Sequence, residues 1–491
     1  MSTTRRTFLA LTLAAATLTA GAQATAAAKT THGTYWVVIL PPDGGPDSFT
    51  AGYLNYAPLN ESGTIGVAGD TGVQGVLNSY SWTDGRQVDF QPLPQVASLT
   101  GTNTYINWIN QWGLAAGYGT RTDTSSGQSY DNAALWLPNG TIIPLKTPAL
   151  STSRAVWVND FGQTSGWIAP GAIPDPCSFG VGDGLQSQAV IWEFGRVQPL
   201  GSLGGTDSYG EFINDLGQIS GHAQTSNAVN SDLGCPPFDP FVWQNGKMID
   251  INPGNFGGAE GGTNYLNNHG QAVGFGTLAG EVYSHAFLWN DGTLIDLTKV
   301  GSLGAPNQEG DTAYNVNERG HVVGGSTAPE GAFLGVLWRN QEFVNLMSLS
   351  AEGDDCSEPN SINSRDQIVG ISFSCETFVQ HAFIWENGSM ADLDTLIPAD
   401  SGIQLVYAGW ITDDGVIAGQ GVLTSGANAG ATRAVLLIPT GGHREDPDPA
   451  SAAAPSHATK SNALLRTADG RLNSLILRPF DPRKLQDSNR N

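Results

Sequence analysis

The chain has 491 residues, of which 14% are charged and 63 are glycine, and its formal net charge is −23. Few charges and many glycines argue against long helices laced with ion pairs and favour short strands joined by glycine turns. The negative charge repels phosphate backbones, which argues against a nucleic-acid partner, and it favours solubility, cations or basic partners.

Residues 1–28 have the features of an export signal. Arg5-Arg6 precede Phe8-Leu9 and an alanine-rich apolar run, which at about a dozen residues is too short to span a bilayer. Small residues follow, as cleavage by signal peptidase requires. Arg-Arg-x-Phe-Leu before such a run is typical of a twin-arginine signal, and an ordinary Sec signal is the alternative. We therefore predict a secreted, extracellular or periplasmic, mature chain without a transmembrane segment.

An Asn-x-x-Gly phrase recurs along the chain with a period of roughly fifty residues, which predicts a solenoid or a propeller. We expect apolar residues before the Asn to form a strand a and residues after the Gly to form a strand b. Asn and Gly favour the tight hairpin between them, because both tolerate left-handed backbone. The eight copies, of which the first and last are degenerate, lie at 59–66, 109–117, 158–166, 213–221, 266–274, 316–324, 362–370 and 411–419.

A second phrase supplies strands c and d. It is written as "HAFLWNDGTLIDL" at 285–297 and "HAFIWENGSMADL" at 381–393, with a glycine turn in the middle. A Trp precedes this turn once per repeat, and we predict that it packs between neighbouring sheets rather than on sugars. The series is Trp82, Trp136, Trp192, Trp243, Trp289, Trp338 and Trp385.

A four-stranded unit of this size cannot bury both of its faces alone, so we predict an all-β, eight-bladed β-propeller over residues 34–439. Seven blades is the alternative if the first copy is a lead-in. The eighth copy stops at 432–439 without a strand d, whereas 34–45 precedes the first hairpin as a strand d does elsewhere. The N-terminal strand is therefore expected to complete the last blade, close the ring and remove an exposed edge.

These phrases resemble the extracellular HAF-repeat family, named for the His-Ala-Phe found here at 285–287 and 381–383. The resemblance covers residues 34–439, although several copies lack the His. It implies a propeller-like secreted repeat protein, and it implies no particular shared activity.

The loops between strands b and c vary in length and carry cysteines. The Gly that closes the hairpin phrase and the Trp are 26 and 22 residues apart in copies three and four, against 15 in copy five. Long loops on a rigid scaffold are where binding sites usually lie. Cys177 and Cys235 fall in the two long loops, while Cys356 and Cys375 flank the seventh hairpin symmetrically. We predict two disulfides, 177–235 and 356–375, as suits an oxidising compartment, with metal binding the lesser option.

The loops entering strand a carry carboxylates in copies four to seven. Four neighbouring blades could build an acidic crescent at the funnel. Such a crescent could bind Ca²⁺ or act as acid and base on a glycoside, and ordinary solvated charge is the alternative. The catalytic candidates are Glu260, Glu309 and Asp311, and the binding candidates are Asp207, Glu211, Asp354, Asp355 and Glu358.

Signatures of other chemistry are missing from the sequence, which has no Gly-x-Ser-x-Gly and no His-Glu-x-x-His. His285 and His381 are expected to make hydrogen bonds within the blades. The leading prediction is a monomeric extracellular module that binds glycans or cations, with a polysaccharide or cell-surface component as partner. The alternative is a carbohydrate-active enzyme, a polysaccharide lyase or glycoside hydrolase, that uses the acidic residues.

The repeat ends before a tail, residues 440–491. Its first part, to residue 462, is rich in Pro, Ala and Ser and has the composition of a linker. The tail contains eight of the 22 Lys and Arg residues. We predict that it is mostly disordered, with docking on the acidic ring or on an anionic surface as the alternative.

Overall fold

The computed structural model describes residues 33–50, 56–74, 76–148, 151–171, 173–175, 177, 184–230, 234–252, 256–279, 283–304 and 310–441. All of them belong to one compact unit, His32–Asn491. The predicted export signal, most of the tail and Glu309 lie outside the described residues. No helix among the described residues is long and apolar enough to cross a membrane.

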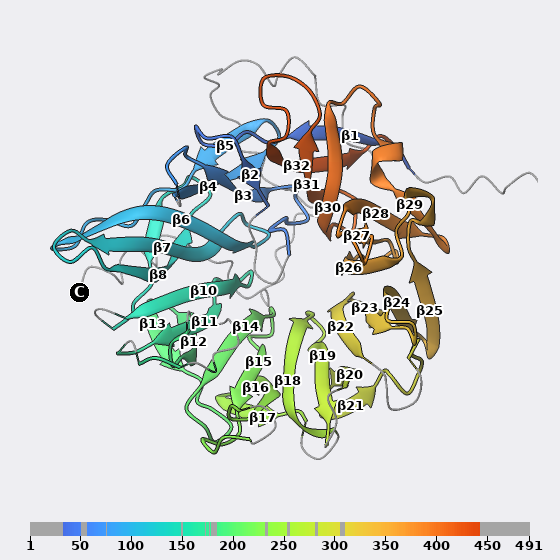
Figure 1. Cartoon of the computed structure of the whole chain (residues 1–491). Helices are drawn as coiled ribbons and strands as arrows, with labels where there is room; N and C mark the ends of the chain where they lie inside the picture. The colour runs from blue at the N-terminus through green and yellow to red at the C-terminus, as the bar shows by residue number, and fades with distance from the viewer. Residues whose placement is uncertain are drawn as a thin grey trace, which may run out of the picture. The chain divides into compact units, whose positions relative to one another are not determined.

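Eight four-stranded antiparallel sheets form a ring, with strand a of each sheet innermost (Figure 1). Blade 1 is β2 (Ser48–Phe49), β3 (Ile65–Asp70), β4 (Leu77–Thr83) and β5 (Arg86–Asp89); blade 2 is β6 (Leu99–Ile109), β7 (Ala115–Asp123), β8 (Ser129–Trp136) and β9 (Ile142–Pro144); blade 3 is β10 (Thr152–Val158), β11 (Thr164–Ala169), β12 (Gln188–Glu193) and β13 (Arg196–Pro199); blade 4 is β14 (Ser208–Ile213), β15 (Ile219–Gln224), β16 (Phe238–Gln244) and β17 (Lys247–Asp250).

The second half of the ring repeats the plan, with two short 3₁₀ helices, η3 (Ser350–Glu352) and η4 (Leu393–Leu396). Blade 5 is β18 (Gly257–Leu266), β19 (Gln271–Leu278), β20 (Ser284–Asn290) and β21 (Thr293–Asp296); blade 6 is β22 (Asp311–Val316), β23 (Val322–Thr327), β24 (Phe333–Arg339) and β25 (Glu342–Met347); blade 7 is β26 (Cys356–Ile362), β27 (Ile368–Phe373), β28 (Gln380–Glu386) and β29 (Ser389–Asp392); blade 8 is β30 (Ile403–Ile411), β31 (Ile417–Leu423), β32 (Thr432–Pro439) and β1 (Tyr35–Ile39).

The predicted ring closure is confirmed, because β1 pairs with β32 as the outer strand of blade 8 (Figure 1). The register runs from Tyr35 opposite Pro439 to Ile39 opposite Val435. The Leu40 N–H donates to the Ala434 carbonyl (2.9 Å) just beyond this ladder. The degenerate first copy forms a blade of its own, so the ring has eight blades.

The repeated Asn joins neighbouring blades in addition to making its own turn. In blade 4, Asn214 Oδ1 accepts from the Leu216 and Gln218 N–H groups (3.1 and 3.0 Å). Its Nδ2 donates to Gln218 Oε1 (2.8 Å) and to the carbonyl of Asn267 (3.0 Å) in blade 5. The same bond to the next blade occurs seven times, from Asn60 to Asn110 through to Asn363 and Thr412. These bonds form an inner belt at the hairpin end of strands a.

The hairpin Gly is required by both conformation and space. Gly217 has φ of 73°, and a Cβ placed on it would lie 3.2 Å from Gln163 Oε1 of the preceding blade. The seventh hairpin has Asp366 at this position, with φ of 61°. Asp366 tolerates the left-handed conformation, and its carboxylate pairs with Arg319 (2.7 Å) and His321 (2.8 Å) of blade 6. In the seventh hairpin, the ion pairs of Asp366 therefore replace the close packing of a hairpin Gly against the preceding blade.

The Trp series packs between blades, as predicted. The Trp136 and Trp338 side chains are buried, and their indole N–H groups donate to carbonyls that follow strand d of the preceding blade. These acceptors are Gln91 O (2.8 Å) and Gly301 O (2.9 Å). A buried indole with a satisfied N–H stabilises the wedge between two sheets without exposing a sugar-binding face.

Aromatic side chains meet at the ring centre. Tyr56, fully buried, makes edge contacts with Trp157 (6.3 Å), Phe212 (5.9 Å), Tyr265 (5.8 Å) and Trp410 (5.5 Å) between ring centroids. These four come from blades 3, 4, 5 and 8, and each is the second residue before the hairpin Asn or Thr. The axis is therefore filled by aromatic rings at this level.

Candidate functional site

The predicted acidic residues at the entry to strands a are mostly buried. Asp207 accepts from the Ser187 N–H (3.1 Å), and Asp311 accepts from the Ser302 hydroxyl (3.1 Å). Burial, with the nearby Asp175 carboxyl, raises the pKa of Asp207 to about 8. Burial also raises the pKa of Asp311, whose exposed fraction is 0%. Both carboxyls act as internal acceptors that order the loop between two blades.

Two more of these carboxylates pair with histidines. Asp354 Oδ2 lies 3.0 Å from His381 Nδ1, and Glu211 Oε1 lies 3.2 Å from His222 Nδ1. The repeat histidine thus makes an intrablade contact, as expected, and His285 does the same with Asp296 (3.0 Å).

Glu260 and Glu358 differ from the others because both are half-buried. The backbone of Glu260 exchanges hydrogen bonds with the Thr277 hydroxyl (3.1 Å). Burial raises the pKa of Glu358, and burial with the Glu358 charge raises the pKa of Tyr314 and Tyr407. Glu358 is thus the predicted carboxylate that shares its surroundings with side chains of both neighbouring blades.

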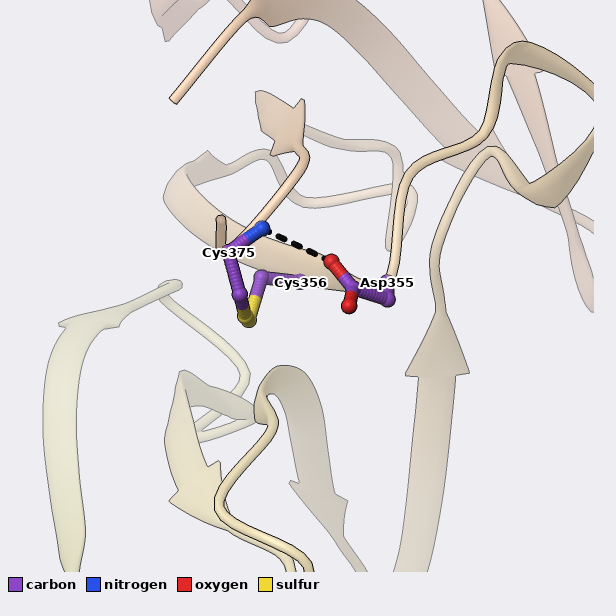
Figure 2. A group of neighbouring side chains, drawn as sticks. All are labelled: Asp355, Cys356 and Cys375. Atoms are coloured by element: carbon purple, nitrogen blue, oxygen red, sulfur yellow. Dashed lines mark hydrogen bonds between the residues drawn. A yellow bond between two sulfur atoms is a disulfide. The ribbon is translucent and has the colours of Figure 1, made fainter. Parts of the chain in front are cut away.

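The predicted acidic residues do not converge on one point within the described part of the chain. The group of three potential ligands found there with ligand atoms within 4.8 Å is Asp355, Cys356 and Cys375. Figure 2 shows that the two cysteines form a disulfide, and that Asp355 Oδ1 accepts from the Cys375 N–H (2.7 Å). Disulfide sulfurs are not thiolate ligands, so this group is a disulfide-bonded loop and not a metal centre.

Both predicted disulfides are confirmed. Cys177 and Cys235 join the long b–c loops of blades 3 and 4, with Cα atoms 5.6 Å apart. Cys356 and Cys375 join the start of β26 to the loop after β27. Both lie on the face that carries the b–c loops and the loops entering strand a.

A cleft of about 240 Å³ lies on the opposite face, between blades 1 and 2. Strands β4 and β5 supply one wall, and the blade 2 hairpin and c–d turn supply the other. The lining residues are Thr64, Ser81, Thr83, Arg86, Val88, Gln111, Trp112, Gly113 and Pro138.

Trp112 dominates the cleft, with 60% of its surface exposed. The hairpin backbone that carries it is fixed, because the Trp112 backbone N–H donates to Asn110 Oδ1 (3.0 Å). The adjacent Gln111 is held at both ends: its N–H donates to Asp160 Oδ1 and its Oε1 accepts from the Glu61 N–H, both at 3.0 Å. An exposed aromatic face beside hydroxyl, amide and guanidinium groups is the composition of a small polar-ligand site.

The sequence interpretation missed this cleft because its residues come from two repeats. Trp112 occupies a variable position of the Asn-x-x-Gly phrase, where the other copies have Ser62, Phe161, Leu216, His269, Arg319, Arg365 and Asp414. The sequence did contain one signal of the cleft, which is a large apolar residue, Trp112, in a hairpin turn that is expected to face solvent.

No family model and no curated protein matches the chain. Among solved structures, uncomplexed Pyrococcus horikoshii acylaminoacyl peptidase is 11% identical with a TM-score of 0.39, over 77% of this chain and 59% of that one. The polysaccharide lyase Uly1 is 10% identical (TM-score 0.33; 83% and 100%). An Aleuria aurantia lectin mutant with Fucalpha1-6GlcNAc is 11% identical (TM-score 0.29; 60% and 96%). At these values the similarity carries no argument about function, which must come from this chain's own residues.

Proposed function

We propose that this chain is a secreted binding module of the HAF-repeat type that holds a saccharide in the cleft between blades 1 and 2. The observation that carries the proposal is the exposed Trp112 ring, on a hairpin backbone held by hydrogen bonds, beside Arg86, Gln111 and Thr83. The C–H face of a pyranose packs on an indole, while its hydroxyls need donors and acceptors around the rim. The cleft is smaller than the ~300–1,000 Å³ of drug-sized ligand sites, so it suits one terminal sugar of a larger glycan.

Secretion is part of the proposal. Residues 1–28 have the pattern of an export signal, and the two disulfides fit an oxidising compartment. The partner is then an extracellular polysaccharide or a glycosylated cell-surface component.

The alternative of a carbohydrate-active enzyme has less support. Asp311, a predicted catalytic residue, has no exposed surface and bonds to Ser302, so a substrate would reach it only after the loop opened. Glu260, a predicted catalytic residue, and Glu358, a predicted binding residue, are both half-buried, and of the two Glu358 has a pKa raised by burial, as suits a general acid.

Calorimetric titration against a panel of neutral, acidic and amino sugars tests the proposal. We expect a binder in the millimolar range or tighter, that is about −4 kcal/mol, and a loss of at least tenfold in affinity in Trp112→Ala. The matched control is Leu216→Ala, at the same hairpin position of blade 4 and outside the cleft, which should bind normally. Absence of any binder, or equal binding by the Trp112 variant, would refute the proposal. Product formation from a polysaccharide that is abolished in Glu358→Gln would favour the enzyme instead.

A further inference from the structure

Apolar side chains on the hairpin face of blades 2–4 form a patch that we call the apolar arc. It consists of Trp112 (60% exposed), Phe161 (42%), Phe194 (75%) and Leu216 (66%). Three of them occupy the same position, two residues after the hairpin Asn, in three consecutive blades. Large apolar residues gathered on one face of an otherwise acidic surface indicate an interaction site.

Hydrogen bonds between neighbouring hairpins join the turns that carry three members of the arc, Trp112, Phe161 and Leu216. The Gln111 N–H donates to Asp160 Oδ1 (3.0 Å), and the Asp160 N–H donates to Asp215 Oδ1 (2.9 Å). Each of these three residues immediately precedes a member of the arc. The same kind of bond, from a backbone N–H to a side-chain oxygen of the next hairpin, joins the Asp413 N–H to the Glu61 carboxylate (2.9 Å). The arc therefore lies along a row of carboxylates.

Charge and composition point to one occupant within the chain. Residues 33–441 contain 11 Lys and Arg against 39 Asp and Glu, a net charge of −28. Residues 460–484 contain six Lys and Arg against two Asp, a net charge of +4. That segment also contains Leu464, Leu465, Leu472, Leu475, Ile476, Leu477 and Phe480. Apolar residues interspersed with cations match an apolar surface bordered by carboxylates.

The tail leaves the ring on the correct face. A Cβ placed on Gly415, in the blade 8 hairpin, would lie 3.4 Å from Pro439 Cγ, so the end of β32 is at the hairpin face. Blades 8 and 3 meet at the axis, where the rings of Trp410 and Trp157, each two residues before its hairpin, are 6.5 Å apart. The 18 residues of 442–459 can span up to ~60 Å when extended, at ~3.3–3.6 Å per residue, which is ample.

We propose that residues 460–484 dock on the part of the apolar arc that belongs to blades 3 and 4 of the same chain, which leaves Trp112 free for the cleft. Leucine, isoleucine and phenylalanine side chains of the segment cover Phe161, Phe194 and Leu216, and its cations face the carboxylates of Asp160 and Asp215.

Tryptic cleavage after Arg466 and Arg471 of the full mature chain, followed by mass spectrometry, tests the docking. We expect both sites to be cut at least tenfold more slowly than in a synthetic peptide of residues 460–484. The double variant Phe161→Ser, Leu216→Ser should lose this protection, and raised salt should weaken it because the charges are screened. The control Phe378→Ser, Val379→Ser removes two exposed apolar residues from the opposite face and should keep the protection.

Carbodiimide cross-linking gives a second readout that does not depend on cleavage. We expect links from Lys460 or Lys484 to Asp160 or Asp215 at a yield independent of protein concentration. Equal cleavage of the chain and the free peptide, or protection unaffected by the arc variant, would overturn the proposal. Cross-links that grow with protein concentration would assign the arc to a second copy and would also overturn it.

Discussion

Replacement of the belt residue Asn214 measures how much one inter-blade bond contributes to the ring. Asn214 is buried, and its side chain takes part in four hydrogen bonds, three within its own hairpin and one to the Asn267 carbonyl in blade 5. Asn214→Ala removes all four. Asn214→Thr copies the natural arrangement of blade 8, where Thr412 Oγ1 accepts from the Val416 N–H (3.0 Å).

A net contribution of about 1 kcal/mol per hydrogen bond gives a cost of roughly 4 kcal/mol for the Ala variant. The Thr variant keeps part of the turn and should cost about 2 kcal/mol. An unfolding entropy near 2.1 cal/mol/K per residue over roughly 400 residues gives ~0.85 kcal/mol per degree. The expected decreases in Tm are therefore about 4–5 °C for Ala and about 2 °C for Thr.

Differential scanning calorimetry at a fixed scan rate is the assay, because a domain of this size can unfold irreversibly. The reasoning fails if the Ala and Thr variants have the same Tm, since the turn bond that Thr keeps then contributes nothing. It fails equally if the Thr variant has the Tm of the unsubstituted protein, since the bond to Asn267 that both variants lose then contributes nothing. It also fails if the Ala variant falls by less than 1 °C.

Three further results are expected. Val38→Pro should lower Tm by several degrees. The Leu40 N–H donates to Ala434, so the Val38 N–H, two residues earlier in the strand, also faces β32. The Val37 N–H points away from β32, so Val37→Pro should be tolerated much better, and equal losses of Tm would contradict the register. Tyr56→Phe removes the hydroxyl that reaches the carbonyls of Tyr314 (2.6 Å) and Asn264 (3.0 Å) and should cost about 1–2 kcal/mol, whereas an unchanged Tm would show that this bond is dispensable. Loss of hydration, with the charges of Asp413 and Asp414, raises the pKa of Glu61 to about 7, so its contribution to stability is complete below pH 4.5 and is lost as pH rises through 7. Glu61→Gln should therefore raise Tm more at pH 8 than at pH 5, and an equal change at both pH values would exclude this titration.

The sequence predicted the blades because their determinants are local and repeated. The hairpin phrase and the glycine turn each fix a reversal of the chain, and counting them gives eight blades. Closure by Tyr35–Ile39 followed from a missing strand at the other end. Cys356 and Cys375 could be paired because they lie symmetrically about one hairpin.

The role of Asn214 between blades could not be predicted in the same way. Its Nδ2 acceptor in blade 5 is set by the distance between neighbouring hairpins, which depends on the curvature of the finished ring. Asp311 shows the same limit for the candidate site. The sequence predicts a position for Asp311 in a loop near the axis. The hydroxyl of Ser302, nine residues earlier, donates to its carboxylate, and no sequence motif marks Ser302 as this partner.

The cleft was beyond sequence reasoning because no single repeat contains it. Arg86 and Thr83 come from blade 1, while Gln111 and Trp112 come from blade 2. Their proximity arises only when the blades pack, so a search for motifs within one repeat separates the two halves.

The pairing of β1 with β32 also fixes the order of events during synthesis. Of the strands that the structure describes, Tyr35–Ile39 is the first to leave the ribosome, yet its partner is made about 400 residues later. Such a long-range contact is slow to form because a large loop must close first. The nascent protein must therefore keep the apolar strand Tyr35–Ile39 from self-association until Thr432–Pro439 has been made. Truncation before Thr432 would release a polypeptide in which Tyr35–Ile39 has no partner strand.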